Sequence, residues 1–310
     1  MALTISDVTY AGEAAGEFIV KALTGNETVD GGHIHVESGI KKKFTIPRLS
    51  VDGIIQDYAA EPVNSGTITV DGATITPNRF MLYVEFNPKD FHDHWFANQL
   101  SGNLLDERLP QTIESALIQE YMKYFNNYMN KAIWQSRTTN TDTFKYWNGL
   151  IYNALADSTV IDTASATTIT AANVEAQLQL VEDKIRDSVP DLLYDENLKI
   201  FTSYKTANLW EQAQYAGTYK GLNNTEKGVM KFHGRTIVPI KGMPDNTMFA
   251  AKGSTGRDSN LWLGINDFAD ATVQVGKKNN YGDLWFIKML FEADVQIGFG
   301  SETVLYTTLS

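Results

Sequence analysis

The sequence contains no cysteine among its 310 residues. Disulfide bonds, thiolate zinc sites and cysteine nucleophiles are therefore excluded. Small secreted domains often depend on disulfides, so this composition fits synthesis and folding in a reducing cytoplasm.

Long apolar runs are missing as well. No stretch approaches the roughly 18 consecutive apolar residues that a transmembrane helix needs. The first residues, MALTISDVTYAGEAAG, have neither the basic start nor the apolar core of a secretory signal. We therefore expect a chain that is neither membrane-spanning nor secreted.

Basic charge is in deficit, because 26 lysines and arginines face 37 acidic residues and leave a formal net charge of −11. This balance argues against a protein whose main task is to grip nucleic-acid phosphates. Hydrophobic residues at 43% and charged residues at 20% are typical of a folded chain. Its length is sufficient for a sizeable core in two or more subdomains.

Motifs of catalysis are also absent, since the sequence has no G-x-S-x-G, no H-E-x-x-H and no P-loop. The stretch Gly253-Ser-Thr-Gly-Arg257 lacks the P-loop lysine, so a turn is favoured there. The pairs His92-x-His94 and His33-x-His35 offer metal-ligand spacing, but catalytic zinc usually needs a third protein ligand. We predict no catalytic, cofactor-binding or metal-binding residue and no cofactor.

What the sequence does contain is a long amphipathic helix, predicted over Pro110–Gln135. Pro110 suits the first helical turn, and polar turn residues follow from Arg137. At 1.5 Å per residue the helix should be roughly 40 Å long. Its apolar stripe, at helical spacing, consists of Ile113, Leu117, Tyr121, Tyr124, Tyr128 and Ala132, widened by Ala116, Phe125, Met129 and Ile133.

A strand of similar length is predicted near the C-terminus. Apolar residues alternate with polar ones over thirteen positions, where strands usually have five or six. A long helix needs an apolar surface of its own length, so we expect this strand to lie along it. The apolar positions are Ile287, Met289, Phe291, Ala293, Val295, Ile297 and Phe299.

Residues 33–86 are predicted to form strands that run out into a projecting β-loop and return to a sheet. Within them, Val70-Asp71-Gly72-Ala73 predicts a hairpin, because Asp-Gly suits a two-residue primed turn. Residues 1–32 are glycine-rich and predict an arm, with a short helix over Glu13–Leu23. An arm cannot bury a core alone, so it should lie against something else.

Three consecutive lysines, Lys41, Lys42 and Lys43, form the one basic cluster that we single out. They could touch nucleic acid, form a solvated strand edge that discourages pairing, or meet an acidic patch on a neighbouring copy. In a chain of net charge −11 we place nucleic acid last. The triplet is our candidate intersubunit contact.

A compact α/β region is predicted after the loop at 157–168. One helix should present Val174, Leu178, Val181 and Ile185 on a single face. Further elements are a strand over Leu198–Thr202, a helix capped by Ser203, and strands over Gly234–Ile240 and Thr247–Ala251.

This order of elements resembles the major capsid protein family of tailed double-stranded DNA phages, whose fold is shared with encapsulin shells. The phrases that carry the resemblance are YAGEAAGEFIVKALTGN in the arm, Ile40–Phe86 as an E-loop, Pro110–Gln135 as a spine helix, Trp147-Asn-Gly-Leu150, Leu198–Trp210, Phe232–Pro239, Met243–Asp245, Ala271–Val275 and Phe286–Phe299.

The resemblance implies an α+β fold divided along the chain. Its expected parts are the N-terminal arm at 1–32, the E-loop and first peripheral (P) domain strands at 33–86, the P-domain with spine helix 110–135 at 87–143, the axial (A) domain at 144–270, and returning P-domain strands at 271–310.

The same resemblance implies a major capsid protein that assembles into hexamers and pentamers of an icosahedral head around double-stranded DNA. It also implies a virion location after synthesis in a bacterial cytoplasm. Implied partners are other copies of the chain, a separate scaffolding protein, a portal, minor or decoration proteins, and DNA that is enclosed without sequence-specific binding.

Two features depart from many family members. No highly charged helical segment precedes the arm, and no Lys–Asn pair with an acid identifies a covalent crosslink. The alternatives are an encapsulin-like nanocompartment, which the net charge does not distinguish from a phage capsid, and a hydrolase with an unrecognised carboxylate site.

Overall fold

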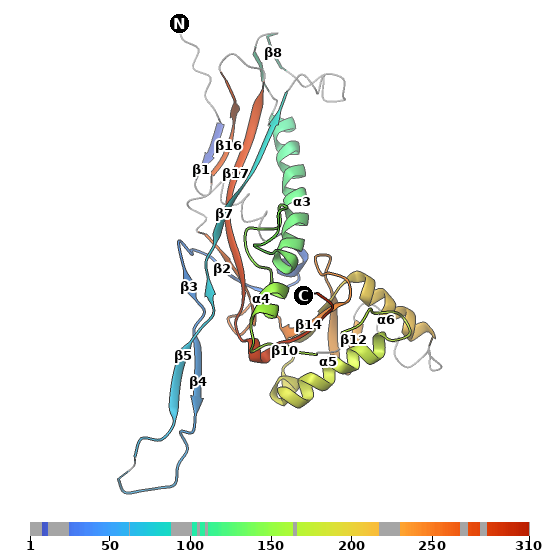
Figure 1. Cartoon of the computed structure of the whole chain (residues 1–310). Coiled ribbons are helices and arrows are strands. Elements are labelled where there is room, and N and C mark those ends of the chain that lie inside the picture. Colours follow the sequence, from blue (N-terminus) through green and yellow to red (C-terminus); the bar gives the residue numbers. More distant parts are fainter. Residues whose placement is uncertain are drawn as a thin grey trace.

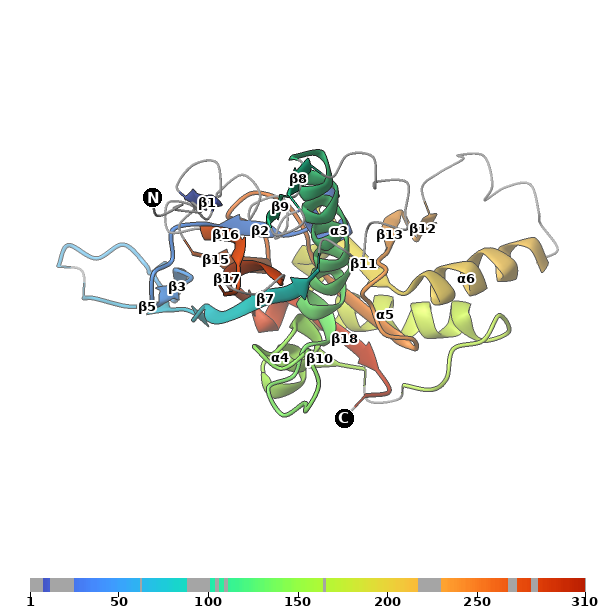
Figure 2. The same ribbon diagram turned by 90° about the horizontal axis from the view of Figure 1, so that it is seen from above.

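The computed structural model describes residues 8–11, 25–61, 63–87, 101–103, 106–108, 111–163, 166–216, 230–266, 272–279 and 284–309. Two lobes and a long loop extend from a central helix, α3 (Figure 1). Seen from above, the loop and the second lobe lie on opposite sides of α3 (Figure 2). Among the described residues, no helix is both long and apolar enough to cross a membrane.

The first lobe is a six-stranded sheet organised on β17, Trp285–Ile297. One edge of β17 pairs with β7 (Asn78–Phe86). The other edge is shared, since its first part pairs with β16 (Thr272–Lys277) and its last part with β15 (Leu261–Ile265). The outer strands are β1 (Val8–Ala11), antiparallel to β16, and β2 (His35–Glu37), parallel to β15.

The helix α3, Gln111–Gln135, packs along this sheet. The alternating apolar side chains of β17 from Ile287 to Ile297 are all buried, and the Phe125 ring stacks on Phe291 with centroids 4.1 Å apart. The predicted helix, the predicted strand and their pairing are therefore confirmed. The predicted stripe is partly wrong, because Tyr124 is 69% exposed whereas Ile118, outside that stripe, is buried.

The second lobe is a six-stranded sheet in the order β10-β18-β14-β11-β13-β12. One face packs on α5 (Val174–Ser188) and α6 (Tyr204–Ala216), and the other on Trp134 at the end of α3. Its strands are β10 (Ile161–Asp162), β11 (Leu198–Thr202), β12 (Met230–Phe232), β13 (Arg235–Pro239), β14 (Thr247–Lys252) and β18 (Val304–Thr307).

The apolar helix face and the helix cap that the sequence predicts for this lobe are confirmed. Val174, Leu178, Val181 and Ile185 are buried on one face of α5. Ser203 precedes α6, and its hydroxyl accepts a hydrogen bond from the Thr206 N–H at 3.2 Å. Shorter elements of the chain are α4 (Leu150–Ala156), η3 (Pro190–Tyr194), η5 (Gly300–Glu302) and the hairpin β8 (Ser101–Asn103) with β9 (Asp106–Arg108).

The projecting loop leaves the first lobe as β3 (Phe44–Thr45) and β4 (Arg48–Asp52), and returns as β5 (Thr67–Asp71) and β6 (Thr74–Ile75). The predicted Asp71-Gly72 hairpin is wrong, because β5 pairs with β4 and β6 pairs with β3. The returning chain therefore continues past Gly72 instead of reversing. Gly72 lies so close to the Ile46 carbonyl that a Cβ atom would collide with it.

The predicted arm is described in part. Val8–Ala11 forms an edge strand of the first sheet, and the short helix α2 (Glu27–Asp30) packs against α3. There the Glu27 N–H donates to Asn130 Oδ1 at 2.9 Å, and Trp134 Nε1 donates to Thr28 Oγ1 at 3.0 Å. The helix expected over Glu13–Leu23 lies outside the described residues.

Candidate assembly surfaces

Of the histidines considered as metal ligands, His33 and His35 contact neighbouring polar groups. Nδ1 of His33 is 3.1 Å from Lys199 Nζ, and burial, with a smaller effect of the Lys199 charge, lowers the pKa of His33 to about 4. His35 lies between the Thr255 carbonyl and Glu37. Across the described chain, no three His, Cys, Asp or Glu side chains gather as metal ligands. His92 and His94 lie outside the described residues.

The tip of the projecting loop, residues 53–66, presents apolar side chains to solvent. Ile55 and Tyr58 are 94% and 97% exposed, and Ile54 and Val63 are exposed as well. A two-stranded ribbon is at best marginally stable alone, and contiguous exposed apolar residues mark interaction surfaces. From the sequence we predicted a projecting β-loop but did not single out its tip as an apolar surface. The available signal was apolar residues between two glycines in a segment without helical or strand periodicity.

The base of the loop is held firmly on the first lobe. A small apolar cluster joins Ile40, Ile46 and Ile75 to Trp262 of β15. Beside it, the Asp294 carboxylate accepts hydrogen bonds from the N–H groups of Thr76 and Val295, both at 2.8 Å. Burial raises the pKa of the Asp294 carboxyl to about 6, and these two hydrogen bonds oppose the rise.

The candidate contact residues Lys41, Lys42 and Lys43 are exposed between β2 and β3, where the loop leaves the lobe. The structure therefore places them at the base of the loop and away from its tip (Figure 1). Gly253–Arg257 lies in the connection between β14 and β15.

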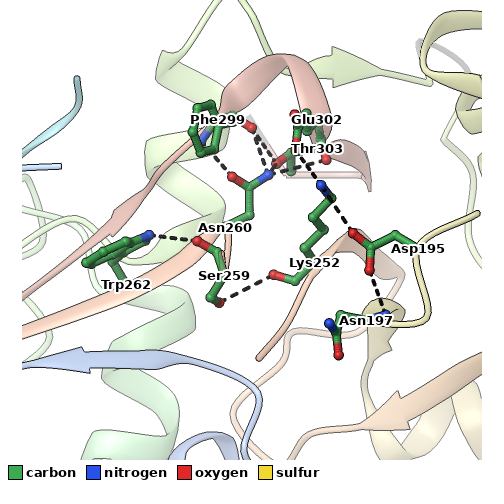
Figure 3. Close-up of polar contacts among 9 residues, drawn as sticks. All are labelled: Asp195, Asn197, Lys252, Ser259, Asn260, Trp262, Phe299, Glu302 and Thr303. Atoms are coloured by element: carbon green, nitrogen blue, oxygen red, sulfur yellow. Dashed lines mark hydrogen bonds and ion pairs between the residues drawn. The ribbon is translucent and has the colours of Figure 1, made fainter. Parts of the chain in front are cut away.

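The junction between the lobes is polar (Figure 3), and within it Asn260 and Thr303 are buried whereas Lys252, Asp195 and Glu302 are partly exposed. Asn260, in the segment from β14 to β15, accepts a hydrogen bond from the Phe299 N–H at 2.7 Å. Its amide donates to the Phe299 carbonyl at 2.9 Å and to Thr303 Oγ1 at 3.2 Å, both in the segment from β17 to β18. Lys252 Nζ lies 3.2 Å from Asp195 Oδ2 and 3.3 Å from Glu302 Oε2.

A third connection joins the same junction. Asp157 and Thr159, on the way to β10, lie so close to Gly300 that a Cβ atom there would collide with both side chains. The Ile161 N–H donates to the Thr303 carbonyl at 3.0 Å. The segment that carries Asn260 and the chain at Ile161 are thus both hydrogen-bonded to the segment from β17 to β18, and these bonds restrain the connection between the lobes.

The fold is similar to solved shell proteins over nearly its full length. The capsid of Myoviridae phage XM1 matches 91% of this chain and 92% of its own, with a TM-score of 0.56 and 14% identity. The capsid asymmetric unit of cyanophage A-1(L) covers 99% and 97%, with a TM-score of 0.58 and 12% identity.

Two further solved structures match the chain over nearly its full length. The capsid of a native GTA particle covers 99% of this chain and 94% of its own, with a TM-score of 0.58 and 11% identity. A virus-like particle from Pyrococcus furiosus covers 95% and 98%, with a TM-score of 0.51 and 8% identity. No protein-family model and no curated protein sequence matches the chain.

Proposed function

We propose that this chain, which has the fold of tailed-phage major capsid proteins, is the repeating subunit of a closed icosahedral shell. The observation that carries the proposal is the loop, which projects from a well-packed body and exposes Ile55 and Tyr58 almost completely. Burying these exposed apolar side chains against another surface would lower the free energy.

Copies would join as hexamers and pentamers, with the loop of one copy lying on its neighbour. In this proposal residues 1–32 are the arm, 33–86 the E-loop region, 87–143 and 271–310 the P-domain, and 144–270 the A-domain. Strand pairing supports two adjustments to these bounds. Leu261–Ile265 pairs with β17 of the first sheet, and Val304–Thr307 belongs to the second.

The shell would enclose double-stranded DNA without reading its sequence. A net charge of −11 supports this role, because an acidic lining does not adsorb phosphate. Assembly would take place in the bacterial cytoplasm with a separate scaffolding protein, a portal and minor or decoration proteins, and the subunit would perform no catalysis.

The second candidate is an encapsulin-like compartment, which the likeness to the virus-like particle supports. The phage head is preferred because phage capsids reach TM-scores of 0.56 and 0.58 against 0.51 for that particle.

Expression of the chain, alone and with a scaffolding protein, followed by electron microscopy tests the proposal. We expect closed icosahedral particles with five-fold and six-fold clusters. Particles that enclose an enzyme and no DNA would favour the compartment. Monomers under every condition would refute both candidates.

A further inference from the structure

We propose that the acidic tip of the loop in one copy of this chain binds the lysine triplet Lys41–Lys43 at the loop base of the next copy. The inference rests on the proposed shell function and names the two surfaces that would hold neighbouring subunits together.

Among the residues that the structure describes, the lysine triplet has no counterion. All three lysines are exposed, and none has an acidic partner among the residues that the structure describes. The acid nearest in sequence is already engaged, because Glu37 is 3.1 Å from His35 Nε2 and 3.2 Å from Arg257 Nη2. Three adjacent ammonium groups repel one another, so an incoming acidic surface would relieve that repulsion.

The loop tip has the complementary charge. Residues 52–66 include three acids and no lysine or arginine, and the acids are Asp52, Asp57 and Glu61. All three are exposed, and no described basic side chain forms an ion pair with them. They alternate in sequence with the exposed Ile54, Ile55 and Tyr58, so one surface carries both charge and apolar area.

These two surfaces do not neutralise each other within one chain. Asp52 follows Lys43 by nine positions of mostly extended chain, which at ~3.3 Å per residue is roughly 30 Å. The Debye length at physiological salt is about 8 Å, so the two groups barely interact. Figure 1 also shows the tip pointing away from the base at β3.

A second copy of the chain could supply the acidic partners of the lysines and cover the apolar tip in one contact. Lysine stems are aliphatic, so they can cover Ile55 and Tyr58 while their ammonium groups reach the carboxylates. The contact is heterologous, since tip and base are different surfaces, and repetition of such a contact generates rings. Charge complementarity across it would mainly set the partner and the register.

The absence of native cysteine permits a direct test of proximity. The full chain carrying Lys42→Cys and Asp57→Cys is assembled, oxidised and run on a non-reducing gel. We expect a ladder of disulfide-linked multimers, because each copy joins two neighbours. The matched control, Asp57→Cys with Lys145→Cys, moves one cysteine to another exposed lysine and should give no ladder. Equal ladders from both pairs, or none from the first in well-formed particles, would overturn the proposal.

Charge reversal tests the energetics. At about 50 mM salt, K41E/K42E/K43E and D52K/D57K/E61K should each lower particle yield at least about tenfold, and all six changes in one chain should restore it. The control K123E/K145E/K205E has the same change in formal charge as K41E/K42E/K43E and should assemble normally. Circular dichroism checks that every variant folds.

These experiments test the proposed shell function and the tip-to-base contact separately. If the unmodified chain forms no particles, the proposed function fails. If it forms particles and both reversed triplets do so with equal yield, the shell stands and the tip-to-base contact is wrong.

Discussion

At the scale of single residues, Asn260 shows how a polar side chain fixes a junction between lobes. It is fully buried, and its one amide satisfies the N–H and carbonyl of Phe299 together with the Thr303 hydroxyl. The Phe299 carbonyl also accepts hydrogen bonds from the Glu302 N–H and the Thr303 hydroxyl, so Asn260 adds to the bonds that hold the segment from β17 to β18. Figure 3 shows Asn260 facing this segment.

Replacing Asn260 with alanine should therefore lower the free energy of unfolding by about 3 kcal/mol, because the hydrogen bonds of its buried amide to Phe299 and Thr303 would be lost. Urea unfolding measures this loss. Asn64→Ala on the exposed loop is the control and should change stability by less than about 0.5 kcal/mol. Equal effects of both substitutions would contradict the role given to Asn260.

A second prediction at this scale concerns pH. The folded-state pKa of Asp294, about 6, lies above the ordinary value of 3.8, so the folded state holds this proton more tightly. Its contribution to stability is present below about pH 4 and is lost as the pH rises through about 6, by about 3 kcal/mol in total. His33 acts in the opposite direction, because its lowered pKa makes acid destabilising.

The variant Asp294→Asn should separate these opposing effects. Between about pH 4 and about pH 7 its stability should rise more steeply than that of the unmodified chain, since the Asp294 effect no longer opposes the His33 effect. Denaturant unfolding at a series of pH values gives both curves. Parallel curves would mean that Asp294 titrates at an ordinary pKa.

At the scale of elements, α3 and β17 pack together because the apolar face of each covers the apolar face of the other. Their contact joins Phe125, Met129 and Ile133 to the alternating apolar residues of β17. The period of 3.6 predicted the helix, but the rotation of its stripe depended on where the sheet lies. Tyr124 therefore faces solvent although its spacing placed it on the buried side.

Two substitutions on this helix test that rotation. Met129→Ala, at a side chain that is 0% exposed, should cost about 2 to 5 kcal/mol through lost contacts and a cavity. Tyr124→Ala, only five residues earlier, should cost less than about 0.5 kcal/mol. Thermal or urea unfolding compares them, and similar losses would place the stripe where the sequence pattern alone had put it.

At the scale of the whole molecule, stability and the proposed assembly depend on different parts. The buried core runs from the first sheet through α3 to the second lobe, whereas the loop tip contributes exposed residues only. Removal of the tip should therefore spare the fold and remove assembly.

The pairing of Asp52 with Thr67 at the end of the ribbon allows a clean deletion. Residues 53–66 are replaced by Asn-Gly, which suits a two-residue hairpin at that point. We expect a folded monomer with an unchanged melting temperature that forms no particles by electron microscopy. Normal particles from this variant would exclude the tip as an assembly surface.

By itself the sequence determined what depends on local pattern: the long helix, the thirteen-residue strand, the α/β elements, and the lack of disulfide and thiolate chemistry. These features follow from periodicity and composition, which neighbouring residues carry. The triplet Lys41–Lys43 was equally visible, but its location at the loop base was not.

Only the tertiary structure decided which strands pair, how α3 is rotated and which apolar residues stay uncovered. The free energy of strand pairing arises between segments far apart in the chain. The strands on either side of Asp71-Gly72 therefore pair with β4 and β3 and not with each other. Likewise, exposure of Ile55 and Tyr58 is a property of what the rest of the chain fails to cover.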